Sequence, residues 1–153
     1  MQITFRTIAI SLVMVAASVR GAAASGPHCS NKTAVGSWGF TSTGSIPVIG
    51  LVAAVGIFTA DGAGNLSGSQ TRSLAGAIAD ETFTGTYTVN SDCTGTDVIQ
   101  VYEAGVLVRT STLKVVYDQN GREARAIFQS VVLPNGTSLP AVLTIEARRI
   151  SGE

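Results

Sequence analysis

The sequence predicts an all-β protein, and three observations carry that prediction. Gly, Thr, Ser, Val and Ala dominate the chain, which favours strands and turns over helices. The stretch 82–89 alternates strictly, with Phe83 and Tyr87 on one face and threonines on the other, as in a half-buried antiparallel strand. Similar runs recur every ten to fifteen residues or so, between turn formers. We therefore expect an eight-stranded antiparallel up-and-down barrel, because closure pairs the sheet edges, with a two-sheet β-sandwich as the alternative.

The N-terminal segment has the pattern of a signal peptide. Arg6 supplies a positive charge, and an apolar run follows at 7–19, which is too short to span a bilayer. The alanines at 22–24 predict cleavage after Ala24. Residues 1–24 are thus the expected signal peptide and 25–153 a single β-barrel domain, secreted or periplasmic, with no membrane span after cleavage. An uncleaved membrane anchor is the alternative.

The two cysteines of the chain, Cys29 and Cys93, both follow the predicted cleavage site. An even pair in an exported chain predicts one disulfide, which would stabilise the fold by roughly 4 kcal/mol in the chain-entropy model. Two unpaired buried thiols are the alternative. The only histidine, His28, has no second histidine or paired cysteine spacing near it, so we expect no metal site.

Turn formers bound the expected strands. The eight strands are expected at 33–43, 51–60, 65–74, 80–89, 94–103, 107–117, 122–133 and 139–149. The first carries Trp38 and Phe40 on one face and ends at a Gly-Ser-Ile-Pro break. The second is nearly all apolar, which indicates that both faces are covered or that one meets a partner. The third places Gln70 and Arg72 on the same face as its leucines, and the fourth is the alternating stretch around Phe83.

The later strands follow the same logic. The fifth places Gln100 and Tyr102 on one face with Val98, and the sixth places Arg109 on the face of its leucine and tyrosine. An Asn-Gly pair predicts a tight hairpin before the seventh strand, on which Phe128 alternates with polar residues. The eighth opens at a proline, which suits the first position of a strand.

Catalytic motifs are missing from the sequence. There is no Gly-x-Ser-x-Gly motif and no phosphate-binding loop before a helix. Asp80 and Glu81 adjoin, so they would point to opposite faces of a strand, which is typical of a loop. Four further acidic residues alternate with apolar ones and are expected in solvent: Asp97, Glu103, Glu123 and Glu146. We predict no catalytic residue and no cofactor, and, because there is no basic stripe, no nucleic-acid partner.

Three segments resemble a known group of proteins. They are 36–40 (Gly-Ser-Trp-Gly-Phe), 58–68 around the Asp-Gly-Ala-Gly turn, and 83–95. Together they resemble exported, uncharacterised bacterial domains whose architecture is similar to calycin-like barrels and to allene oxide cyclase and dirigent barrels. The resemblance implies a fold and a compartment, and no activity.

A narrower likeness concerns the lipocalins, which place Gly-x-Trp on the first strand and a basic residue near the end of the last. Gly36-Ser37-Trp38 matches the first feature, and Arg148 or Arg149 stands where the second is expected. The likeness implies a cation stacked on the indole. The alternative is that Trp38 is simply a large plug at one end of the barrel.

We expect a binding module for a small apolar ligand or an envelope partner. The expected ligand-binding residues are Trp38, Phe40, Gln70, Arg72, Phe83, Tyr87, Gln100, Tyr102 and Phe128. The competing interpretation puts the polar members at barrel rims, or shifts the register by one residue. Two other functions stay open: a self-associating structural barrel that uses the apolar strand 51–58, and an allene oxide cyclase-like enzyme with Gln70, Arg72, Gln100 and Tyr102 around an apolar substrate.

Overall fold

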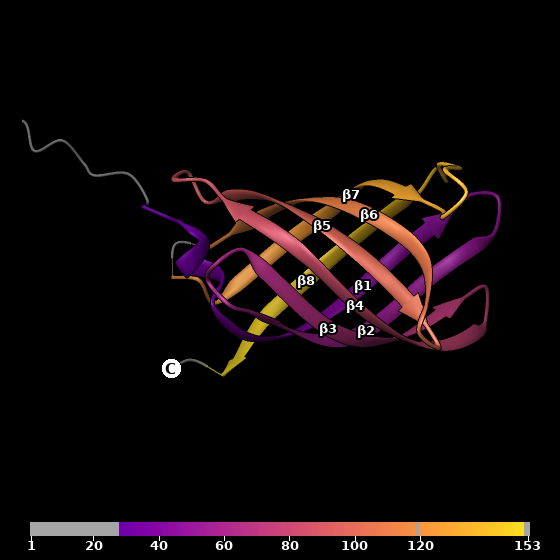
Figure 1. The fold of residues 1–153 in the computed structure, drawn as a ribbon, viewed down its shortest axis with the longest axis horizontal. Coiled ribbons are helices and arrows are strands. Elements are labelled where there is room, and N and C mark those ends of the chain that lie inside the picture. The colour runs from indigo at the N-terminus through magenta and orange to yellow at the C-terminus, as the bar shows by residue number, and fades with distance from the viewer. Residues whose placement is uncertain (1–27, 119, 152–153) are drawn as a thin grey trace, which may run out of the picture.

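The computed structural model describes residues 28–118 and 120–151, which form a closed barrel of eight antiparallel strands (Figure 1). The predicted signal peptide, 1–24, lies outside the described residues. The elements are η1, a 3₁₀ helix (Asn31–Ala34), β1 (Gly36–Ile46), β2 (Gly50–Ala60), β3 (Asn65–Leu74), β4 (Ala77–Val89), β5 (Thr94–Glu103), β6 (Val106–Tyr117), β7 (Glu123–Val132) and β8 (Val142–Ser151).

Closure of the barrel is made by the first and last strands. β8 pairs with β1, with Phe40 opposite Ala147 and Gly44 opposite Leu143. Every other strand pairs with its neighbour in the chain. The predicted up-and-down barrel is therefore confirmed, and the sandwich alternative is wrong.

The bounds of β1 and β4 differ from those that the sequence predicts. β1 continues through Gly44 to Ile46, where a break was expected. Gly44 does not interrupt the strand, because it lets β8 approach closely: a Cβ at this position would collide with the carbonyl oxygen of Val142. β4 begins at Ala77 and not at Asp80, so Glu81 lies well inside a strand and not in the expected loop.

The short helix η1 was not expected from the sequence, and it lies against one end of the barrel (Figure 1). The Asn31 side chain accepts a hydrogen bond from the backbone N–H of Val89 at 2.8 Å. The Asn31 carbonyl accepts another from the Tyr87 hydroxyl at 3.0 Å. Just before η1, Cys29 is bonded to Cys93, with their Cα atoms 4.9 Å apart, which confirms the predicted disulfide.

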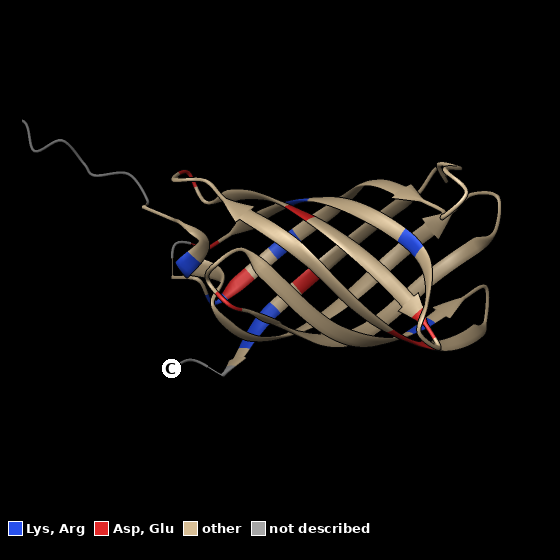
Figure 2. Cartoon of the chain, viewed as in Figure 1, with Lys and Arg blue, Asp and Glu red and all other residues tan. Residues whose placement is uncertain are grey.

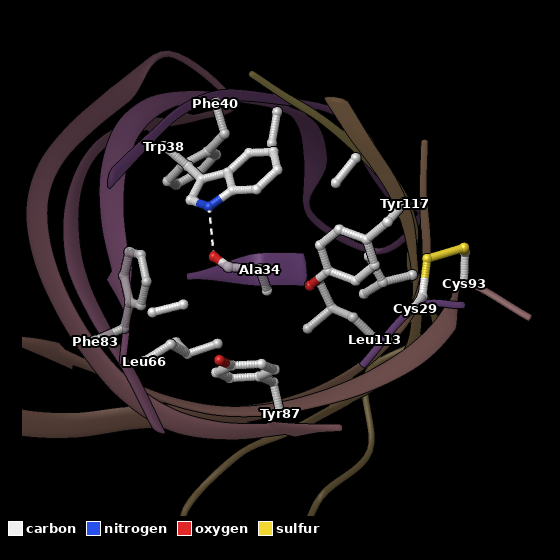
Figure 3. Close-up of a cluster of buried hydrophobic side chains, with 14 of the residues drawn as sticks. Cys29, Ala34, Trp38, Phe40, Leu66, Phe83, Tyr87, Cys93, Leu113 and Tyr117 are labelled. Atoms are coloured by element: carbon white, nitrogen blue, oxygen red, sulfur yellow. Dashed lines mark hydrogen bonds between the residues drawn. A yellow bond between two sulfur atoms is a disulfide. The ribbon is translucent and has the colours of Figure 1, made fainter. Parts of the chain in front are cut away.

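The core fills the η1 end of the barrel. Figure 3 shows Trp38 above Ala34, with the rings of Phe83, Tyr87 and Tyr117 around them. Trp38 is fully buried and stacks on Phe58 with ring centroids 5.9 Å apart. Charged residues are sparse along the ribbon (Figure 2). Packing at this end is therefore driven by apolar and aromatic burial, which contributes about 25 cal/mol per Å² of apolar surface removed from water.

Candidate functional site

The η1 end of the barrel is sealed by a cluster around Trp38. The indole Nε1 donates to the Ala34 carbonyl at 2.8 Å (Figure 3). The Arg149 guanidinium lies over the indole, 4.8 Å from the ring centroid. It also donates to the carbonyls of Thr33, at 2.8 Å, and Gly121, at 2.7 Å. Arg149 thus joins the end of β8 to η1 and to the β6–β7 turn.

This geometry confirms the expected pairing of the indole with a basic residue and identifies which arginine makes it. The pairing residue is Arg149. Arg148 points outward instead, with a side chain 82% exposed, and lies 3.3 Å from a Glu123 carboxylate oxygen. Trp38 also acts as the plug of this end, so both interpretations of the tryptophan apply.

The opposite end of the barrel contains a cavity of about 200 Å³, here called the mouth cavity. It reaches the β1–β2 and β7–β8 loops, where Ile49, Leu133 and Leu139 line it. Apolar walls are formed by Ile46, Val52, Ala54, Leu74, Val108, Phe128, Val131 and Leu143, and the Ser42 side chain also lines the cavity. The barrel is therefore asymmetric, packed at the η1 end and hollow at the other.

A network of charged and polar side chains forms the inner boundary of the mouth cavity. Glu81 lies at its centre with a side chain that is fully buried. Arg109 donates to both Glu81 carboxylate oxygens at 2.7 Å. Arg72 donates to one of them at 2.7 Å, and Gln70 to the other at 2.6 Å. A second carboxylate, Glu103, lies 3.6 Å from Arg72, so the network holds two cations and two anions.

The ionised form of Glu81 is strongly favoured by this network. Burial alone acts to raise its pKa, because a low-dielectric site disfavours charge. The hydrogen bonds and charge of Arg109, with the hydrogen bonds from Arg72 and Gln70, outweigh burial and lower the pKa to about 2. Glu81 is therefore a buried carboxylate that is already fully paired.

A second cavity, of about 60 Å³, lies deeper in the barrel and is here called the inner cavity. It shares Gln70, Arg109 and Phe128 with the mouth cavity, so one layer of side chains separates the two. Apolar and aromatic side chains form most of its wall, including Phe40, Phe58, Leu66, Phe83, Ile99, Val101, Leu113, Val115 and Tyr117. The carboxyl of Asp97 also lines it.

Asp97 corrects the expectation that this residue faces solvent. One of its carboxylate oxygens is buried and makes no hydrogen bond. Burial raises the pKa of Asp97 to about 7. Neither inward carboxylate, Glu81 or Asp97, was expected inside the barrel, because each stands in the sequence beside residues that suit a solvent-exposed strand or a turn.

The structure places seven of the nine expected binding residues inside the barrel. Phe40, Gln70, Phe83 and Phe128 line the inner cavity, and Arg72 lines the mouth cavity. Trp38 and Tyr87 lie inside too, in the packed η1 end. Whether these seven bind a ligand stays a prediction.

The face assigned to the fifth strand was wrong. Gln100 is exposed and accepts a 3.4 Å hydrogen bond from the Tyr102 hydroxyl on the outer surface. The inward residues of β5 are Asp97, Ile99 and Val101, because Tyr87 pairs with Asp97 across the β4–β5 ladder. Alternation then puts Gln100 and Tyr102 outside. The four residues expected in an enzyme site therefore lie on opposite faces of the barrel wall, with Gln70 and Arg72 inside and Gln100 and Tyr102 outside.

Two further features of the described residues bear on function. Within 28–118 and 120–151, no group of three or more His, Cys, Asp or Glu side chains is placed to hold a metal ion. In the same part of the chain, none of the helices has the length and hydropathy needed to cross a bilayer.

Comparison with known proteins supports the barrel fold and identifies no family. No family model and no curated protein matches the chain. Among solved structures, a redesigned β-barrel, mFAP1, bound to DFHBI is similar with a TM-score of 0.53 and 16% identity, over 78% of this chain and 97% of the other. The S-type phycobiliprotein lyase CPES from Guillardia theta aligns with a TM-score of 0.44 and 7% identity, over 80% and 92% of the two chains. The likeness to the redesigned barrel shows a shared barrel fold.

Proposed function

We propose that the protein is a small-ligand-binding barrel that takes an apolar molecule into the mouth cavity. The observation that carries this proposal is a cavity of about 200 Å³ with mostly apolar walls at one end of a barrel whose other end is sealed. An engineered apolar cavity of about 150 Å³ is large enough to bind benzene. The mouth cavity therefore suits a ligand of one or two rings, or a short branched chain.

The polar network at the base of the cavity is compatible with an apolar ligand. Both carboxylates of the network are paired with guanidinium groups, so the network needs no ligand charge to complete it. The redesigned barrel mFAP1, which shares this fold, is bound to DFHBI, and ligand binding by a barrel of this kind agrees with the proposal.

The proposed setting is an exported protein, secreted or periplasmic. The signal-peptide pattern at 1–24 motivates this proposal, and the Cys29–Cys93 disulfide supports it, because structural disulfides persist in oxidising compartments. Intact-mass measurement of the protein recovered from its host tests the point. The mass of residues 25–153 is expected, and a mass that includes the N-terminal segment would contradict the proposed export.

Ligand binding is tested best by filling the mouth cavity from one wall. Ala54 on β2 lines the cavity, whereas its neighbour Ala53 is exposed on the outer surface. Toluene titrated into the wild-type protein should shift the methyl NMR signals of Val131 and Leu143. Ala54→Phe should abolish these shifts, and Ala53→Phe should leave them intact. Shifts that persist in Ala54→Phe, or a wild-type protein that binds no apolar probe, would refute the proposal.

Self-association is a second candidate, favoured by the outer surface of β2. Leu51, Val55 and Ile57 all point outward and are 76%, 60% and 55% exposed. An exposed apolar strand of this kind is typical of an interface. Light scattering should then give an oligomer for the wild-type protein and a monomer for Val55→Lys, while a monomeric wild-type protein would remove this candidate.

A further inference from the structure

The inner cavity contains a carboxyl group without a partner. Asp97 points inward from β5, and one of its oxygens is buried without a hydrogen bond. None of the ion pairs among the described residues includes Asp97. An unpaired buried carboxylate is costly, and native structures normally satisfy such groups with protein, water or a bound species. The buried oxygen of Asp97 is therefore open to a hydrogen bond from water or from a bound species.

A second polar group in the same cavity is also free to accept a hydrogen bond. The hydroxyl of Tyr117 points toward the barrel interior (Figure 3), and no hydrogen bond between described residues involves it. Asp97 and Tyr117 both line the inner cavity, and the charge of Asp97 contributes to raising the pKa of Tyr117, after the larger effect of burial. The Tyr117 hydroxyl can accept a hydrogen bond as well as donate one, so a species with several N–H donors can bond to both Asp97 and Tyr117.

The walls of the inner cavity favour a cation over an anion. Four phenylalanine rings, Phe40, Phe58, Phe83 and Phe128, line it together with the Tyr117 ring. A cation among aromatic rings is attracted by their quadrupoles, and an anion is not. Of the cationic side chains at the cavity, Arg109 is bonded to both oxygens of Glu81. Arg125 is an exposed residue opposite Glu146 in the β7–β8 ladder, so neither arginine neutralises Asp97.

We propose that the inner cavity is a binding site for a small primary ammonium group, held by the Asp97 carboxylate and the Tyr117 hydroxyl. A primary ammonium carries three N–H donors, enough for both acceptors. The cavity volume of about 60 Å³ restricts the ligand to the size of methylammonium or ethylammonium. This site is separate from the mouth cavity and goes beyond the proposed function, since binding of an apolar molecule in the mouth cavity does not require it.

The proposal is tested by titrating methylammonium and following methyl NMR signals. The signals of Ile99, Leu113 and Val115, which line the inner cavity, should shift. Those of Val131 and Leu143, which line only the mouth cavity, should not. Toluene should give the opposite pattern, so a failure at one site is distinguishable from a failure at the other.

Variants identify the groups that hold the ammonium. Asp97→Asn should weaken methylammonium binding at least about tenfold, because a charge-assisted hydrogen bond becomes a neutral one. Tyr117→Phe should weaken it by a smaller factor. Asp80→Asn is the matched control, since Asp80 is exposed and accepts a hydrogen bond from Thr71, and it should leave binding unchanged. Equal binding by Asp97→Asn and the wild type would overturn the proposal.

Two further measurements separate an ammonium site from a general polar cavity. Acetamide, which is neutral, should give no inner-cavity shifts, and binding as tight as that of methylammonium would overturn the proposal. Because the ligand needs the ionised carboxylate, the affinity should fall roughly 30-fold between pH 8 and pH 5.5 for a group that titrates near pH 7. The titratable groups that affect Asp97 from neighbouring strands, Tyr87 and Tyr117, have raised pKa values and stay neutral over this range. An affinity independent of pH would also overturn the proposal.

Discussion

Replacing Glu81 tests the central network of the barrel, because this fully buried carboxylate holds two guanidinium groups. Glu81→Gln keeps the size of the side chain and removes its charge. The pKa of Glu81 falls from the ordinary value of 4.5 to about 2, a shift that corresponds to about 3 kcal/mol of stabilisation at neutral pH. Breaking a buried ion pair by removing one partner typically costs about 3–5 kcal/mol, which agrees.

The pH dependence of this effect has a definite sign. A carboxylate whose pKa is lowered on folding stabilises the protein fully above the pKa of its unfolded state, near 4.5, and the stabilisation is lost as the pH falls toward 2. Urea unfolding of the disulfide-bonded protein should therefore show wild type more stable than Glu81→Gln by about 3 kcal/mol at pH 7. The difference should become small at pH 2.

A control on the outer surface separates this effect from a general effect of charge. Glu146 on β8 is exposed, and Glu146→Gln should change stability by less than about 0.5 kcal/mol. A Glu81→Gln difference below about 1 kcal/mol at pH 7, or one that stays constant down to pH 2, would refute the reasoning. Either result would mean that the two arginines are solvated well enough without Glu81.

Three further predictions concern other parts of the barrel. The raised pKa of Asp97 means that wild-type stability carries a component that decreases as the pH rises from about 4 to about 7, and urea unfolding of Asp97→Asn should lack that component. The double variant Cys29→Ser/Cys93→Ser should lose about 4 kcal/mol of stability by urea unfolding, since the bond closes a loop with a sequence separation of 64, and a loss below about 1 kcal/mol would contradict the entropic account. Arg149→Ala should shift the emission of the buried tryptophan to longer wavelength, whereas Arg148→Ala should not, and no shift in either variant would remove the stacked cation.

The strand count and the closure of the barrel were predictable because they depend on local signals. Turn formers separate eight strand-like runs, and closing them into a barrel pairs the two sheet edges that would otherwise stay open. The likeness to lipocalins implied that Trp38 pairs with Arg148 or Arg149, and the structure identifies Arg149. The strand count depends on turn residues and alternation within each run, which explains why it is confirmed.

The orientation of β5 was not predictable from its own residues, because both of its faces mix apolar and polar side chains. The register across the preceding turn decides the orientation: Val89 lies opposite Gly95, which puts Asp97, Ile99 and Val101 inside. That turn contains Cys93 at a φ of 68°, a conformation that a non-glycine residue rarely adopts. The inward face of β4 determines the inward face of β5 only when the conformation of the turn between them is known, and the sequence does not specify that conformation.

The two carboxylates that were expected in a loop or in solvent face inward for different reasons: Asp97 follows the register of β5 against β4, and Glu81 shares a face of β4 with Phe83. Glu81 and Asp97 both face inward, yet their pKa values move in opposite directions. The difference lies in their partners, because two arginines and a glutamine surround Glu81 and no described side chain bonds Asp97. Folding explains Glu81, since the network is charge-balanced and joins β3, β4 and β6. Folding gives no reason for an acid at position 97, because an apolar residue there would pack against Leu113 without a penalty. The cost of burying the Asp97 carboxyl without a partner is what points to a ligand.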